Sequence, residues 1–274
     1  MFKNVRYPAV AGRFYPMDRD DLKEIIEHCF EHDLGPGALG DTGHTREIKA
    51  LMSPHAGYLA SGMFAAHAYS ALREDGLPEA YIIIGPDHYG IPHDFALCSD
   101  AFLTPLGECQ THPDICARLR EMMPDDQRAH MREHSIEVQV PFIQTIDPDA
   151  KIVPIIMGRQ DVRTARRLAD ILKKACEGFD VTFIASTDLM HYVPNEVEDR
   201  LDSIYLEHVS ACDIDEMYRV MYDFDMTVCG NGPTAVAILA SGSTKGILLK
   251  HGNSWDSLGF DENAVVGYAA TKFV

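Results

Sequence analysis

Short apolar runs, each closed by turn residues, recur along this sequence. Residues 80–86 (AYIIIGP) and 151–158 (KIVPIIMG) place apolar side chains on both faces of an extended chain. A strand that is apolar on both faces is covered by helices on each side, which is typical of the parallel strands in α/β proteins. These runs therefore predict a sheet that is buried between helices.

Stretches with helical patterning separate the apolar runs. Strands are predicted at 49–54, 80–86, 151–158, 181–187, 246–252 and 264–274, with short extended pieces between 95 and 105. Helices are predicted at 20–30, 62–72, 113–123, 163–177 and 232–241, and the stretch 135–146 fits either a strand or a helix. This alternation indicates the α/β fold class, and 274 residues are enough for one globular unit.

The charge balance excludes several classes of partner. The chain has 24 basic and 42 acidic residues, a net charge of −18, so its surface repels nucleic acids and anionic membranes. No apolar run reaches the roughly 18 residues of a spanning helix, and the first residues lack the order of a signal peptide. We expect a cytoplasmic protein that binds a small molecule, a peptide or another protein.

Ligand-type side chains follow three of the predicted strands. His55 follows the strand at 49–54, Asp87 and His88 follow the strand at 80–86, and Asp188 and His191 follow the strand at 181–187. In open α/β sheets, binding sites form outside the carboxyl ends of the strands. The recurrence predicts that these residues share one active-site cleft.

Cys229 is the one cysteine expected to face this cleft. It precedes a predicted helix in the segment TVCGNGP, and a helix amino terminus would lower the pKa of its thiol. The spacing of the seven cysteines, without a Cys-x-x-Cys pair, argues against a disulfide framework or a zinc ribbon. The other six are expected to be reduced packing residues, namely Cys29, Cys98, Cys109, Cys116, Cys176 and Cys212.

Each of these residues also has a structural interpretation. A histidine after a strand is more often a hydrogen-bonded loop residue than a metal ligand, and Asp87 or Asp188 could cap a helix. The segment EHSIE adds Glu133 and His134, which alone fit a hydrogen-bonded histidine. The coincidence of several such positions favours a functional site, while the sequence leaves open which of them touch.

The residue types suit a metal centre. Imidazoles with one thiolate or carboxylate are ligands for iron(II), zinc or copper, and two histidines with one anionic ligand leave positions for substrate and dioxygen. A further histidine would act as general acid or base, with an aspartate holding its tautomer. His191 and Asp188 are the candidates for these two roles.

Eight motifs, in order, resemble the Memo family, also called AmmeMemoRadiSam system protein B. They are YPAVAGRFYP, SPHAGYLASG, IIIGPDH, TPLGE, EHSIEVQVPF, STDLMHY, VCGNGP and VVGYAA, and they span residues 6 to about 270. The family is similar in fold to the class III extradiol dioxygenases of the LigB type. The resemblance therefore implies a single domain over residues 1–274, a three-layer αβα sandwich around a mixed, largely parallel sheet.

The resemblance also implies roles for the site residues. His55, His88 and Cys229 would surround a metal, with iron(II) as the first expectation and copper or zinc as alternatives. His191 would match the acid or base histidine of the dioxygenases, with Asp188 beside it. His134 and Asp87 would be cleft or second-shell residues, and Cys229 stands where the dioxygenases use glutamate.

Three functions follow from these expectations. The first is a metal-dependent redox enzyme, whose functional neighbours, as the second family name implies, are an AMMECR-domain protein and a radical S-adenosylmethionine enzyme. The second is a non-catalytic module that binds a peptide or protein in the cleft. The third is a metal-free cysteine hydrolase with Cys229 as nucleophile, His191 as base and Asp188 orienting it.

Overall fold

A mixed sheet forms the centre of the molecule in the computed structural model, which describes residues 5–274. Its eleven strands run in the order β1-β5-β6-β7-β3-β8-β2-β11-β10, with β4 beside β7 and β9 beside β11. The strands are β1 (Val5–Arg6), β2 (Ala50–Ser53), β3 (Ala80–Pro86), β4 (Phe95–Leu97), β5 (Ala101–Thr104), β6 (Gly107–Thr111), β7 (Lys151–Met157), β8 (Val181–Ser186), β9 (His191–Val193), β10 (Gly246–Asn253) and β11 (Val265–Phe273).

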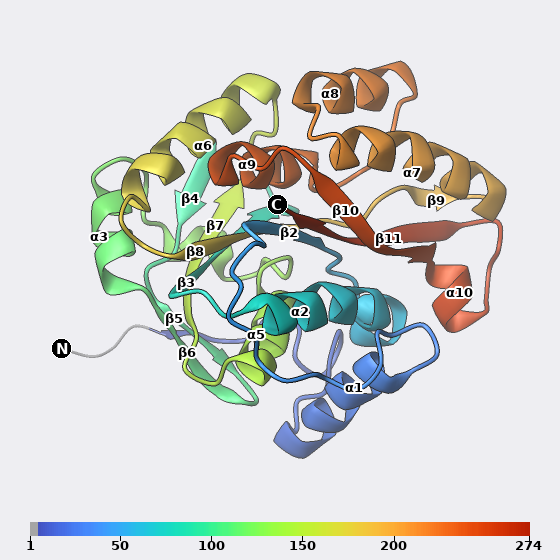
Figure 1. Cartoon of the computed structure of the whole chain (residues 1–274), viewed down its shortest axis with the longest axis horizontal. Helices are drawn as coiled ribbons and strands as arrows, with labels where there is room; N and C mark the ends of the chain where they lie inside the picture. Colours follow the sequence, from blue (N-terminus) through green and yellow to red (C-terminus); the bar gives the residue numbers. More distant parts are fainter. Residues whose placement is uncertain (1–4) are drawn as a thin grey trace.

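Helices cover both faces of this sheet (Figure 1). They are α1 (Arg19–Glu31), α2 (Met63–Asp75), α3 (Pro113–Arg120), α4 (Gln127–His130), α5 (Val140–Ile146), α6 (Val162–Ala175), α7 (Asn195–Ser210), α8 (Ile214–Asp223), α9 (Asn231–Ser241) and α10 (Ser254–Leu258). A π-helical turn, Tyr58–Gly62, precedes α2, and a 3-10 turn, Glu137–Gln139, precedes α5.

The centre of the sheet is parallel, and an antiparallel pair flanks it on each side. Strands β6, β7, β3, β8 and β2 run parallel to one another, whereas β11 pairs antiparallel with β2 and β10. These parallel strands run in the same direction, so the carboxyl ends of β3, β8 and β2 lie side by side. The three strands that were predicted to deliver site residues are neighbours.

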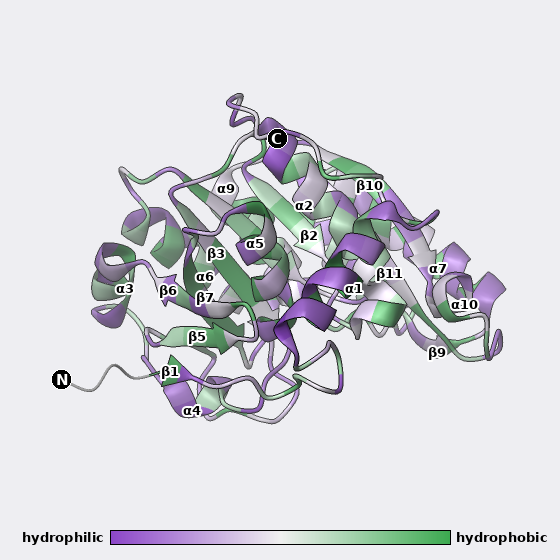
Figure 2. Cartoon of the chain, turned by 90° about the horizontal axis from the view of Figure 1, so that it is seen from below, coloured by the Kyte–Doolittle hydropathy of each residue, from purple (hydrophilic) through white to green (hydrophobic). Residues whose placement is uncertain are grey.

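The alternation along β3 shows how one strand supplies two cores. Ile82 and Ile84 pack into the core that includes α6 and α9, while Tyr81 and Ile83 pack into the core of α1, α2 and α5. Figure 2 shows the central strands as hydrophobic and α1 as largely hydrophilic. The predicted α/β fold, a mixed sheet between two helical layers, is confirmed.

Helix α6 shows how the sequence builds one of these layers. The side chain of Asp161 accepts a hydrogen bond of 2.8 Å from the N–H of Thr164 and so caps the first turn. Leu168 and Leu172, one turn apart, are fully buried, as are the alanines on the same face. The arginines and lysines of this helix lie on its exposed face, so the helix presents one apolar stripe to the sheet.

The structure also resolves what the patterning left open. The stretch 135–146 forms the 3-10 turn and α5, with no strand in it. Helices α7 and α8 occupy a region for which no element was predicted. Within residues 5–274, no helix combines the length and the apolar character needed to cross a lipid bilayer.

Candidate metal centre

Three ligand atoms from distant segments converge at the carboxyl ends of the central strands. His55 follows β2, His88 follows β3, and Cys229 lies in the turn before α9; one ligand atom from each lies within 4.8 Å of the others. The Sγ atom of Cys229 is 3.2 Å from Nε2 of His55, and the rings of His55 and His88 meet edge to face at 5.3 Å. We refer to these three residues as the histidine–cysteine cluster.

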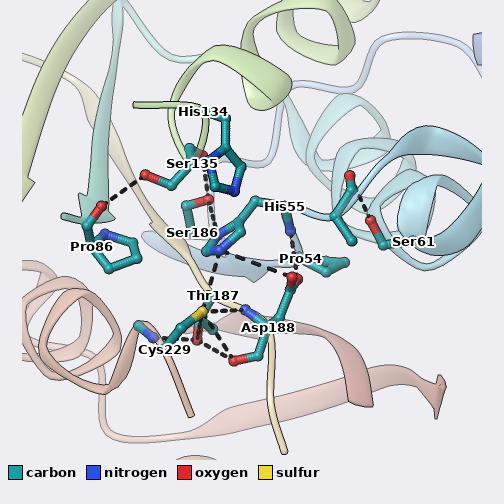
Figure 3. Close-up of polar contacts among 12 residues, drawn as sticks. Pro54, His55, Ser61, Pro86, His134, Ser135, Ser186, Thr187, Asp188 and Cys229 are labelled. Carbon is teal, nitrogen blue, oxygen red and sulfur yellow. Dashed lines mark hydrogen bonds and ion pairs between the residues drawn. The ribbon is translucent and has the colours of Figure 1, made fainter. Parts of the chain in front are cut away.

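The hydrogen bonds around His55 define its tautomer. The hydroxyl of Ser186 donates to the carbonyl of Ser135 at 2.5 Å, so its oxygen can only accept from Nδ1 of His55, 3.0 Å away. Nδ1 therefore carries the hydrogen, and the lone pair of Nε2 faces Cys229 (Figure 3). Burial, followed by the neighbouring His88, lowers the pKa of His55 to about 3, so the ring is neutral at pH 7.

Glu133 orients His88 in the same way. Its buried carboxylate accepts hydrogen bonds from Nδ1 of His88 at 2.9 Å and from the backbone N–H of His88 at 2.7 Å. It also accepts from the backbone of His134 and Ser135, each at 2.8 Å. Burial raises the pKa of Glu133, but these hydrogen bonds outweigh it and hold the pKa well below its usual range. An ionised Glu133 fixes the hydrogen of His88 on Nδ1 and leaves Nε2 available to a metal.

His134 forms a wall of the cluster. Its ring stacks on His88 with centroids 4.6 Å apart and meets His55 edge to face at 5.4 Å. Burial, followed by the neighbouring His55, lowers the pKa of His134 to about 4. The ring is therefore neutral, and its Nδ1 lies 3.4 Å from Oε1 of Glu133.

Asp188 and Asp87 each hold backbone at the site. The Oδ1 atom of Asp188 accepts a 2.7 Å hydrogen bond from the N–H of His55, and its Oδ2 atom lies 3.9 Å from Nε2 of the same residue. Burial raises the pKa of Asp188 above its usual range. The carboxylate of Asp87 accepts from three successive N–H groups, those of Tyr89, Gly90 and Ile91, and so shapes the loop after β3 that carries His88.

His191 is held by a residue that the sequence patterns did not single out. Its Nδ1 atom lies 3.0 Å from the carbonyl oxygen of Thr227, and its N–H donates to the Thr227 hydroxyl at 2.8 Å. Asp188 was expected to hold this tautomer and instead holds the backbone of His55. Because a carbonyl only accepts, Nδ1 of His191 carries the hydrogen and Nε2 is the basic atom.

The environment of Cys229 corrects one expectation. Burial, followed by the charge of Asp188, raises the pKa of the Cys229 thiol, although a helix amino terminus was expected to lower it. The sulfur faces the end of β8, where it lies 3.2 Å from the N–H of Asp188. A cation beside the sulfur would reverse this effect, because a metal-bound thiol is deprotonated.

The donor set of the cluster fits a first-row transition metal. The two imidazoles of His55 and His88 lie beside one thiol, and such mixed nitrogen and sulfur donors suit iron(II), copper and zinc. The carboxylate of Glu133 behind His88 is the outer partner that metal-bound histidines commonly have. The sequence places Glu133 directly before His134, but only the fold shows that it contacts His88.

The other six cysteines lie apart from the cluster. Five are buried and one is partly exposed, and none of the six forms a disulfide: Cys29, Cys98, Cys109, Cys116, Cys176 and Cys212. Burial raises the pKa of each of the five buried thiols to about 12. These positions match the structural role expected of them.

Comparisons with known proteins relate this chain to one family. A family model described as Memo-like protein matches residues 6–272. A MEMO1 family protein of Methanopyrus kandleri is 40% identical over 279 residues, which cover 98% of each chain. Another, of Methanothermobacter thermautotrophicus, is 42% identical over 274 residues, covering 97% of this chain and 99% of its own.

One solved structure is similar in fold. It is the crystal structure of an uncharacterized protein from Escherichia coli K12, with a TM-score of 0.54 and 11% sequence identity. The match covers 83% of this chain and 100% of the other. At this identity, the likeness concerns the fold alone.

Proposed function

Because this chain belongs to the Memo family over residues 6–272, we propose that its histidine–cysteine cluster holds a redox-active metal ion in a metal-dependent oxidoreductase. Iron(II) is the first candidate and copper is the redox-active alternative; zinc suits the same donors but would make the site non-redox. The observation that carries the proposal is the convergence of His55, His88 and Cys229, whose donor atoms lie within 4.8 Å of one another. The hydrogen bonds that turn the Nε2 lone pairs of both histidines outward support it.

The residues around the cluster would each have a separate role in the reaction. A bound iron(II) ion would supply electron exchange with a substrate or with dioxygen. Glu133 and Ser186 keep the two imidazoles in the tautomer that a metal requires. His191, held through Nδ1 by Thr227, presents Nε2 as the group that accepts or returns a proton. Asp188 fixes the backbone of His55 and so keeps the first ligand in place.

Family similarity and net charge suggest the substrate class, the location and the functional neighbours of this activity. The similarity of the family to extradiol dioxygenases of the LigB type supports oxidation of a small molecule, or of a residue in a peptide. The net charge of −18 favours neither nucleic acid nor anionic membrane as partner and agrees with a cytoplasmic location. An AMMECR-domain protein and a radical S-adenosylmethionine enzyme are the proposed functional neighbours.

One contact favours a second candidate, the metal-free cysteine hydrolase. Cys229 and His55 form a close thiol–imidazole pair at 3.2 Å, so His55 would be the base in place of His191, which was expected from the sequence. Both pKa shifts oppose this use, because the pKa of the thiol is raised and that of His55 is lowered to about 3. The pair therefore consists of a neutral thiol and a neutral imidazole. A neutral thiol is a weak nucleophile unless a cation lies nearby.

Elemental analysis of protein purified without oxygen tests the proposal. We expect about one iron or copper atom per chain in the wild type and none in His55→Ala or Cys229→Ser, because each change removes a ligand. His67→Ala and Cys212→Ser are matched controls away from the cluster and should retain the metal. If the wild type lacks these metals even after incubation with iron(II) or copper, and Cys229 forms a covalent adduct with an activated ester, the hydrolase is correct instead.

A further inference from the structure

A second group of ligand-type side chains contacts the segment that carries Asp188 and His191, through the N–H of Met190. Glu198 and Asp202, one turn apart on α7, point toward His251 on β10. One donor atom from each of the three lies within 4.8 Å of the others. The side chains of both acids are 0% exposed and that of His251 is 16% exposed, so the group is reached only from the histidine side.

The hydrogen bonds leave one oxygen of each carboxylate facing the same point. The side-chain amide of Asn253 donates to Oε2 of Glu198 at 2.7 Å, and the N–H of Met190 donates to Oδ1 of Asp202 at 3.1 Å. The remaining oxygens, Oε1 and Oδ2, lie 3.3 Å and 3.5 Å from Nε2 of His251. Among residues 5–274, the fully buried Oδ2 atom of Asp202 has no hydrogen-bond partner.

The buried carboxylates of this group outnumber their basic partner. Within the described part of the chain, the one basic side chain that forms an ion pair with these carboxylates is His251. Burial raises the pKa of Asp202 to about 8, so without a metal Asp202 holds a proton at pH 7 and the charges balance. A divalent cation would displace this proton and pair with both carboxylates.

The spacing of the donor atoms suits a cation. Metal bonds of about 2.0 to 2.2 Å in a tetrahedral arrangement place neighbouring donor atoms about 3.3 to 3.6 Å apart. The observed separations from Nε2 are 3.3 Å and 3.5 Å. On the other side of the ring, Nδ1 of His251 lies 3.9 Å from a carboxylate oxygen of Asp199, where an outer carboxylate would support a metal-bound histidine.

Backbone packing also reserves space for these oxygens. A Cβ atom at Gly267 on β11 would lie 1.9 Å from Oδ2 of Asp202 and 2.4 Å from Oε1 of Glu198. Glycine at this position therefore lets the two free oxygens approach the strand. Any side chain there would push them away from His251.

We propose that Glu198, Asp202 and His251 form a second metal site, distinct from the histidine–cysteine cluster, that binds a divalent first-row cation. One imidazole and two carboxylate oxygens suit Zn²⁺ or Mn²⁺, with water completing the coordination. The site does not depend on the proposed redox function. It joins α7 to β10, and through Met190 and Gly267, which are hydrogen-bonded at 2.9 Å, it braces the segment that carries Asp188 and His191.

Equilibrium dialysis against Zn²⁺ tests this site in a chain whose cluster has been removed by His88→Ala and Cys229→Ala. We expect about one Zn²⁺ per chain and a higher melting temperature when Zn²⁺ is added. Adding Asp202→Asn should lower the Zn²⁺ affinity by about 100-fold or more, since the substitution keeps the shape but removes a ligand charge. Asp215→Asn, an exposed change on α8, should leave binding unchanged.

His251→Gln provides a second variant in case Asp202→Asn does not fold, because the glutamine amide can still donate a hydrogen bond toward the carboxylates. Circular dichroism establishes that each variant is folded before its metal content is compared. Zn²⁺ binding that persists unchanged in folded Asp202→Asn or His251→Gln would overturn the proposal. Failure of the cluster-deleted chain to bind Zn²⁺ would also overturn it and leave a proton as the balancing charge. Neither outcome bears on the metal content of the cluster.

Discussion

Glu133 controls the orientation of His88 through one buried carboxylate. In Glu133→Gln, an amide N–H would face one of the N–H groups that the carboxylate now accepts from, so the hydrogen bond to Nδ1 of His88 would weaken. Changes to such outer partners typically cost 10- to 100-fold in metal affinity. We expect a loss of about this size for iron(II) or Zn²⁺, measured by competition with a chelator.

Glu121→Gln is the control for this prediction, because Glu121 is an exposed residue at the end of α3. It should bind metal as the wild type does. Equal affinities in Glu133→Gln and the wild type would show that His88 keeps its orientation without the carboxylate, or does not bind the metal.

His130 predicts a pH dependence of stability. The ring is buried, its Nε2 donates to the carbonyl of Ala96 at 3.1 Å, and its Nδ1 has no hydrogen-bond partner among residues 5–274. Burial lowers the pKa of His130 from 6.5 to about 4. As the pH falls from 6.5 to 4, His130 binds a proton in the unfolded chain but not in the folded chain. Acidification therefore favours the unfolded chain and lowers the free energy of unfolding.

Urea unfolding between pH 4 and pH 7 measures this effect. The free energy of unfolding should decrease on acidification, with His130 contributing on the order of 3 kcal/mol. In His130→Gln, which cannot titrate, the decrease should be smaller by that amount. Parallel pH profiles for the two proteins would contradict a lowered pKa at this position.

The ligand-type residues of the site could be predicted from sequence, but their hydrogen-bond partners could not. His55, His88 and Cys229 became candidates because each lies next to a recognisable strand or helix, and the resemblance to the Memo family then grouped them around a metal. The partner of His191 proved to be Thr227, which is distant in sequence and has no ligand-type side chain. The direction of the pKa shift of Cys229 was also wrong, because it depends on which atoms surround the sulfur.

At the level of elements, buried apolar strands were the easiest to predict and α7 was the hardest. The strand predicted at 80–86 coincides with β3. Helix α7 buries Glu198 and Asp202 beside Leu201 and Tyr205, so charged residues interrupt its apolar face. A helix whose buried face includes carboxylates lacks the periodic pattern by which helices are recognised. The same acids form the proposed second metal site.

Gly230 sets how closely the turn before α9 approaches β8. A Cβ atom there would lie 2.4 Å from Cβ of Thr187 and 2.5 Å from the carbonyl oxygen of Ser186. Gly230→Ala should therefore displace the turn and move Cys229 away from His55. We expect a loss of about 1 to 3 kcal/mol in the free energy of unfolding, together with reduced metal content.

Gly40→Ala is the matched control for this change. Its Cβ would meet only the flexible side chain of Glu74, at 3.3 Å. Thermal unfolding and elemental analysis of both variants make the comparison. If Gly230→Ala had the same stability and metal content as the wild type, the close approach of the turn to β8 would be refuted.

At the scale of the whole molecule, the alternation of strands and helices predicted the fold class but not the order of the strands. Strand β6 lies between β5 and β7, and β11 lies between β2 and β10. Such pairings depend on contacts between segments far apart in sequence, which local patterns do not encode. The strand order therefore required the structure.

One buried ion pair ties the first described segment to the middle of the chain. Arg6 donates to Glu137, and both side chains are about 1% exposed. The same carboxylate accepts from the N–H groups of Ala9 and Val10 and from the hydroxyl of Tyr15. Removing either charge would leave the other buried without an opposite charge.

We expect Arg6→Met and Glu137→Gln each to lower the free energy of unfolding by about 3 to 5 kcal/mol. The double variant should lose less than the sum, because it leaves no unpaired charge. Lys23→Met removes an exposed ion pair with Asp20 and should cost less than about 1 kcal/mol. Urea unfolding of the wild type and the four variants provides the test, and additive losses would show that the two residues act independently.

The pairing of β2 with β11 has a consequence for biosynthesis. Met52, just before the segment that carries His55, pairs with Thr271, so a strand made early lies beside one made much later. Until β11 leaves the ribosome, one edge of β2 presents unpaired backbone N–H and C=O groups, which readily pair with other chains. The nascent chain therefore carries an unpaired strand edge beside the candidate metal site until β11 has emerged and paired with β2.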